Sequence, residues 1–142
     1  MKTLICYKTK HGSTEKYMKW LAEDLAAEVK SFDQVGRDFD FSGYELVIVS
    51  SGTYCGLMPL NRFLKKFWKK LEVMKVIAVA VGAAAADDSW SVKSYKRIPE
   101  KIRSKIEYVK LIGEMPNAAK AANYQSPVKR ENLGVVLEKI KG

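Results

Sequence analysis

The feature that most constrains the fold is a set of short apolar runs that alternate with segments of helical spacing. The four clearest runs are TLICY (3–7), YELVIVSS (44–51), KVIAVAVGA (75–83) and YVKLIGEM (108–115). Continuous apolar runs of this length are typical of strands buried on both faces, as in a parallel sheet covered by helices. A weaker run, VKSFDQV (29–35), supplies a fifth candidate strand.

The segments between the runs carry helical periodicity. After the first run, Met18, Leu21, Leu25 and Val29 recur at three- and four-residue spacing, which is one buried face of a helix. Three further segments are predicted helices: PLNRFLKKFWKKLEV (59–73), IPEKIRSKI (98–106) and RENLGVVLEKIKG (130–142). The stretch AAADDSWSVKSYKR (84–97) is predicted to be a loop.

This alternation predicts one α/β domain over residues 1–142, a length that is enough for a single buried core. The expected architecture is a three-layer sandwich around a doubly wound, five-stranded parallel sheet. In such sheets, ligands bind beyond the carboxyl ends of the strands, where the strand order reverses. Three loops are expected there: Thr9–Thr14, Ser51–Leu57 and Gly82–Trp90.

The first of these loops has the chemistry of a phosphate site. Gly12 allows close approach of the backbone, and Thr9, Ser13 and Thr14 offer hydroxyl donors. The free N–H groups of the helix that follows favour an anion. The loop matches neither G-x-x-x-x-G-K-[ST] nor G-x-G-x-x-G. A capped helix after an ordinary turn remains the alternative interpretation.

Charge and composition narrow the classes of partner. Lys and Arg number 25 against 16 Asp and Glu, which gives a net charge of +9. No nucleic-acid-binding motif accompanies this charge, so nucleic acid is not an expected partner. A single histidine, His11, and two cysteines, Cys6 and Cys55, make a zinc site unexpected and favour free thiols. Without a signal peptide or a spanning run, the expected location is the cytoplasm.

Two loop motifs, in register with the strand pattern, resemble those of the flavodoxins. TKHGST (9–14) is similar to the flavodoxin phosphate loop, and SSGTYCG (50–56) is similar to the family's second flavin loop. The resemblance spans nearly the whole chain. The most similar branch is the one that contains menaquinone-dependent protoporphyrinogen oxidases, in which a basic amphipathic helix like NRFLKKFWKK (61–70) follows the second loop.

The resemblance implies a flavodoxin-like fold with FMN as the cofactor. The implied phosphate ligands are Thr9, Lys10, His11, Gly12, Ser13 and Thr14. The residues implied to border the isoalloxazine ring are Ser51, Gly52, Thr53, Tyr54, Cys55 and Gly56, with Gly82, Ala83 and Ala84 beginning the third loop. Tyr54 or Trp90 is expected to stack on the ring. No catalytic acid or base is expected, because the flavin carries the chemistry.

The predicted function is electron transfer, or oxidation and reduction of a small quinone-like or porphyrin-like acceptor. A redox partner protein is the other expected partner. The basic helix face formed by Lys65, Lys66, Lys69 and Lys70 keeps an anionic membrane surface as a further possibility, with peripheral attachment. The alternative function is a non-redox binding or signalling module on the same fold. A magnesium-binding receiver domain is disfavoured, because the first strand ends in Tyr7 and Lys8 and not in aspartates.

Overall fold

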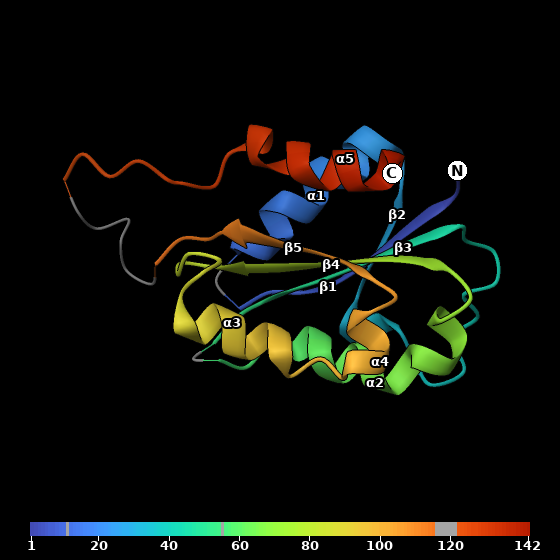
Figure 1. Ribbon diagram of the computed structural model, residues 1–142. Helices are drawn as coiled ribbons and strands as arrows, with labels where there is room; N and C mark the ends of the chain where they lie inside the picture. Colours follow the sequence, from blue (N-terminus) through green and yellow to red (C-terminus); the bar gives the residue numbers. More distant parts are fainter. Residues whose placement is uncertain (11, 55, 116–121) are drawn as a thin grey trace.

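A five-stranded parallel sheet runs through the centre of the molecule (Figure 1). The computed structural model describes residues 1–10, 12–54, 56–115 and 122–142. The strands are β1 (Thr3–Lys8), β2 (Glu28–Ser31), β3 (Leu46–Gly52), β4 (Lys75–Gly82) and β5 (Glu107–Ile112). They lie in the order β2-β1-β3-β4-β5, so the direction of winding reverses between β1 and β3. The predicted doubly wound parallel sheet is therefore confirmed.

Helices cover both faces of the sheet and complete three layers (Figure 1). One face carries α1 (Ser13–Leu25) and α5 (Gly134–Lys141), which is preceded by the 3-10 turn η3 (Arg130–Leu133). The opposite face carries α2 (Pro59–Leu71), α3 (Ser89–Lys96) and α4 (Glu100–Arg103). Each face has its own apolar core, and the central strands β1, β3 and β4 are almost fully buried, as their continuous apolar runs predict. The edge strands β2 and β5 are only partly buried.

Helix α2 forms as its sequence pattern predicts. Pro59 occupies its first turn, where a missing N–H costs nothing. The apolar stripe of Leu60, Phe63, Leu64 and Phe67 is buried against the sheet. Trp68 is also buried, at 7% exposure, so it cannot serve as a surface anchor for a partner or a membrane.

The predicted loop over residues 84–97 is wrong in its second half, because residues 89–96 form α3. Asp88 caps this helix: its carboxylate accepts a hydrogen bond of 2.9 Å from the backbone N–H of Trp90. The run of alanines before Asp88 favoured the prediction of a loop over this whole stretch. The helix predicted over 98–106 is correspondingly shorter, since only Glu100–Arg103 is helical.

The predicted second strand also ends early. Residues 32–34 turn into the 3-10 helix η1 (Phe32–Gln34). Its start is a capping box, in which the Ser31 N–H donates to the Gln34 side chain over 2.8 Å. This turn carries the chain away from the sheet edge and places Phe32 against α2, where its ring stacks on Phe63 at a centroid distance of 4.4 Å.

Cys6 is a free and fully buried thiol in β1. Burial raises the pKa of Cys6 to about 12, and the nearby charge of Lys30 opposes the rise. The thiol is therefore neutral at physiological pH and acts as a small apolar core residue. Cys55 lies outside the described residues.

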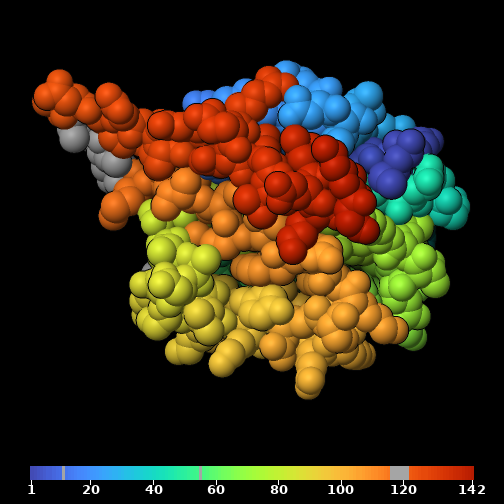
Figure 2. Space-filling view, turned by 45° about the horizontal axis from the view of Figure 1, so that its top comes forward, coloured from blue at the N-terminus to red at the C-terminus, as the bar shows by residue number. Residues whose placement is uncertain are grey.

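Residues 122–127, which precede η3, project beyond the sheet at the edge where the strands end (Figures 1 and 2). Within the described part of the chain, no helix is both long and apolar enough to cross a bilayer.

Candidate functional site

The loops that follow β1, β3 and β4 meet at one edge of the sheet, because these strands are parallel neighbours (Figure 1). The strand order reverses at β1 and β3, which is where an open α/β sheet forms its crevice. These are the three loops in which the sequence places its candidate residues.

The first loop is shaped by Gly12, whose φ of 93° lies in the left-handed region. No atom lies close enough to exclude a side chain there, so the backbone conformation itself favours glycine. The Gly12 N–H donates to Thr9 Oγ1 over 2.9 Å, and the Gly12 carbonyl accepts from Lys16 over 3.0 Å. Thr9 and Gly12 together fold the loop back onto the start of α1.

The start of α1 presents donors without a protein cap. Gly12 is the N-cap residue, and no side chain of the described residues caps this end of the helix. Ser13 Oγ accepts a hydrogen bond of 3.1 Å from the backbone N–H of Glu114 and so ties the loop to the end of β5. A hydroxyl that accepts a bond still has its own hydrogen to donate. Ser13 and Thr9 can therefore each donate to an anion, whereas Thr14 is buried at 2% exposure.

In the second loop, Ser51 has a structural role. Its hydroxyl is buried, donates to the Gly52 carbonyl over 3.0 Å and accepts from the Leu60 N–H over 3.1 Å. These bonds connect the end of β3 to the first turn of α2. The loop between them is closed by two backbone bonds between Tyr54 and Leu57, of 2.6 and 3.0 Å.

Tyr54 joins the second loop to the first. Lys10 Nζ lies 5.3 Å from the centroid of the Tyr54 ring, a cation–π distance. The tyrosine folds back so closely that a Cβ on Gly52 would lie 2.5 Å from its hydroxyl oxygen. Burial raises the pKa of Tyr54, and a hydrogen bond from the backbone of Lys10 opposes the rise. Tyr54 is therefore held as a neutral aromatic side chain between the two loops.

The third loop contacts the second at two places. A Cβ on Gly82 would collide with Thr53 Oγ1, and the Thr53 N–H donates to the Val81 carbonyl over 2.9 Å. Gly56 has a φ of 84°, and a Cβ there would lie 2.9 Å from the ring of Trp90. Trp90 is 51% exposed, so it packs against the second loop with one edge and faces solvent with the rest.

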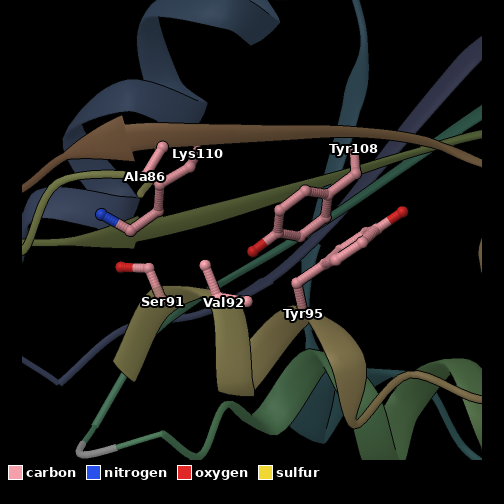
Figure 3. Close-up of a pocket in the computed structure, with 6 residues that line it drawn as sticks. All are labelled: Ala86, Ser91, Val92, Tyr95, Tyr108 and Lys110. Atoms are coloured by element: carbon pink, nitrogen blue, oxygen red, sulfur yellow. The ribbon is translucent and has the colours of Figure 1, made fainter. Parts of the chain in front are cut away.

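Lys110 fixes the third loop, and it was not a candidate from the sequence. It extends from β5 toward the start of that loop (Figure 3). Its ammonium donates to the carbonyls of Gly82 at 2.9 Å, Ala84 at 2.5 Å and Leu111 at 3.3 Å. Burial lowers the pKa of Lys110, and the charge of Asp88 opposes that effect. A lysine within the apolar run YVKLI was the signal that could have found it.

A cavity of about 280 Å³ lies beneath this lysine, between β5 and α3 (Figure 3). Tyr95 and Tyr108 form one wall, with ring centroids 4.6 Å apart. The Ser91 hydroxyl is buried there and has no hydrogen-bond partner among the described residues. Burial, reinforced by Tyr95, raises the pKa of Tyr108 to about 12, so this wall is uncharged.

The structure thus gathers most of the candidate residues at one edge. Thr9, Lys10, Gly12 and Ser13 lie in the first loop, and Thr14 is buried behind them. Gly52 packs against Tyr54, Gly56 against Trp90 and Gly82 against Thr53, while Ala83 and Ala84 continue the third loop above Lys110. His11 and Cys55 lie outside the described residues. Within the described ranges, no three His, Cys, Asp or Glu side chains gather as a metal site would require.

Comparison with known proteins points to one family. A family model described as a flavodoxin domain matches residues 4–119. An uncharacterised protein of Methanocaldococcus jannaschii is 38% identical over 72 residues, which are 49% of this chain and 47% of that protein. The chain thus matches about half the length of this curated relative.

Two solved structures share the fold. A flavodoxin from the domain Archaea superposes with a TM-score of 0.57 at 16% identity and covers 100% of both chains. A flavoprotein of Lactobacillus acidophilus, solved in complex with FMN, superposes with a TM-score of 0.52 at 17% identity. That match covers 78% of this chain and 91% of the flavoprotein.

Proposed function

The chain belongs to the flavodoxin domain family, and on this basis we propose that it is a redox protein that binds FMN at the edge formed by the three loops. One observation carries the proposal. The loop after β1 presents an uncapped helix start together with two hydroxyl donors, at the point where the strand order reverses.

The first loop fits a phosphate group. The N–H groups in the first turn of α1 have no side-chain cap, so they can donate to phosphate oxygens. Thr9 and Ser13 accept backbone bonds and keep their own hydrogens for the same oxygens. Lys10 lies in the same loop and adds positive charge. The helix N–H groups, two hydroxyls and one cation can thus converge on one dianion without a metal ion.

The second and third loops fit a planar aromatic ring. Tyr54 stands on the second loop and Trp90 on the third, and each supplies an aromatic ring that can pack on a planar ligand. When bound, FMN supplies one-electron and two-electron transfer, and the protein's part is to bind and orient it. Thr53 and Lys110 hold the two loops in place through Gly82.

The finer proposal concerns the acceptor. A small quinone-like or porphyrin-like acceptor is supported by the similarity of the first two loops and the basic α2 to the protoporphyrinogen oxidase branch. The net charge of +9 also supports an anionic acceptor or an acidic redox partner.

We expect the purified chain to take up one FMN per molecule, and the bound cofactor to be reduced and reoxidised reversibly. The positive charges of the protein favour the fully reduced flavin, which is an anion. Each exposed charge at ~10 Å contributes ~0.4 kcal/mol to this preference before screening by salt, so several charges together contribute about 1–2 kcal/mol. Since ~1.4 kcal/mol corresponds to ~60 mV for a one-electron step, the potential for full reduction should fall by tens of millivolts from low to high salt.

Equilibrium dialysis with FMN followed by potentiometric titration at both salt concentrations measures this. A chain that takes up no FMN would contradict the proposal itself. A potential that does not change with salt would contradict only the electrostatic tuning.

A further inference from the structure

A second cavity, away from the phosphate loop, has the features of a binding site. It is a groove of about 740 Å³ between η1 and α2, and it extends to Lys8 at the end of β1 and to Tyr54. This volume lies within the range of small-molecule sites. Among the described residues, none of those implied to bind the FMN phosphate lines it.

The groove carries strong positive charge. Five cationic side chains line it, against a single carboxylate, that of Asp33: Lys8, Arg62, Lys65, Lys66 and Arg97. Among the described residues, none of these five makes an ion pair. Charges of this number without an ion-pair partner attract an anionic ligand and give its acidic group several possible contacts.

The floor of the groove is apolar and aromatic. Phe32 stacks on Phe63 at a centroid distance of 4.4 Å, and Phe63 lies 4.7 Å from Phe67. Leu57 is 54% exposed at one end. Phe63 and Phe67 are buried beneath Phe32, so a flat hydrocarbon ring placed here would bury the exposed apolar surface of Phe32 and Leu57.

Asn61 lines the groove, and its side chain carries a buried polar atom without a partner among the described residues. Asn61 is 93% buried, since its exposure is 7%, and its amide nitrogen donates to the Ser94 carbonyl over 3.3 Å. Its carbonyl oxygen, Oδ1, has no hydrogen-bond partner among the described residues. A buried acceptor of this kind is costly unless a water or a ligand donates to it.

We propose that the groove between η1 and α2 binds a small aromatic molecule that carries an acidic group. The cations hold the acid, and the apolar residues of the groove hold the ring. Because Tyr54 lines the groove and also borders the proposed cofactor site, the occupant lies next to the second loop. That this ligand is the redox substrate rests on the proposed function. That the groove binds such a ligand does not depend on the proposed function.

The neighbouring helix face explains why a membrane surface is the weaker occupant. Lys70 is already engaged, because its ammonium donates to the Arg37 and Phe39 carbonyls over 2.9 Å each. Trp68 is buried, so α2 presents no aromatic anchor to lipid. Lys65 and Lys66 line the groove, and Lys69 does not.

The test uses 2-naphthoate as the probe and its neutral counterpart 2-naphthamide as the comparison. Calorimetric titration and amide chemical-shift mapping are carried out on FMN-free and FMN-loaded protein. We expect 2-naphthoate to bind at least ten times more tightly than 2-naphthamide, with shifts centred on Phe32, Asn61 and Arg62. The affinity should fall at least ten-fold in the double variant Arg62→Glu/Lys66→Glu.

The matched control is Lys69→Glu/Lys101→Glu, which changes the net charge equally on exposed lysines outside the groove. Its affinity for 2-naphthoate should stay within two-fold of the parent chain. Equal affinities for the acid and the amide, or equal losses in the two double variants, would overturn the proposal. So would preferential binding of phosphatidylglycerol vesicles with no response to 2-naphthoate.

The two proposals fail in different ways. Binding of 2-naphthoate to FMN-free protein supports the groove even if FMN does not bind. Displacement of 2-naphthoate by FMN would instead show that the groove is part of the cofactor site and would overturn its independence. Circular dichroism of each variant confirms that it is folded before its affinity is compared.

Discussion

Replacing both Thr9 and Ser13 with alanine should weaken FMN binding about 100-fold. Each hydroxyl is placed to donate to a charged phosphate oxygen, and a bond of this type contributes ~1.5–3 kcal/mol. Two such bonds account for at least ~3 kcal/mol, which corresponds to about 100-fold or more in affinity. Fluorescence titration of the FMN-free protein measures the change.

Riboflavin is the internal control, because it shares the ring with FMN and lacks the phosphate. Its affinity should change less than three-fold in the double variant, provided that the loop keeps its fold. Ser104→Ala, at an exposed serine distant from the site, should leave both affinities unchanged. Equal losses for FMN and riboflavin would show that the hydroxyls hold the loop and do not contact a phosphate.

Replacing Lys110 with methionine should lower the free energy of unfolding by about 2 kcal/mol and weaken FMN binding about ten-fold. The variant leaves the carbonyls of Gly82 and Ala84 without their charged donor, in a partly buried position. The third loop then loses the bonds that fix it beside the second. Urea unfolding and FMN titration measure the two effects, with Lys101→Met as a control at an exposed lysine.

The same lysine has a signature in pH. Burial lowers its folded-state pKa below the ordinary value of 10.5, so the unfolded chain binds this proton more tightly. The contribution of Lys110 to stability is therefore lowest below the folded-state pKa and rises with pH up to about 10.5. Lys110→Met should remove this rise. An unchanged pH profile and an unchanged FMN affinity would contradict a role for Lys110 in positioning the loop.

The sequence predicts the sheet and the first loop because both are local patterns. The continuous apolar runs TLICY and KVIAVAVGA indicate strands covered on both faces, and a glycine with hydroxyls after a strand indicates a turn into a helix start. The capping box at Ser31 and the cap at Asp88 are also local patterns. They were not predicted, because Ser31 lies in a weak strand pattern and Asp88 follows a run of alanines.

Other features depend on tertiary register and could not be predicted. Lys110 reaches Gly82 and Ala84 only because β5 lies beside β4 in a particular register, which pairs Lys110 with Ala80. The contact between Lys10 and Tyr54 and the groove between η1 and α2 join segments about thirty to forty residues apart. No periodicity along the chain encodes which side chains meet across such loops.

The most direct test of FMN binding through the loop between β1 and α1 is a parallel titration of the unaltered, FMN-free protein with FMN and with riboflavin. If the uncapped start of α1 and the hydroxyls of Thr9 and Ser13 hold the phosphate, FMN should bind at least ~100 times more tightly than riboflavin. Comparable affinities for the two, or no binding of either, would contradict the assignment of this edge of the sheet as an FMN site.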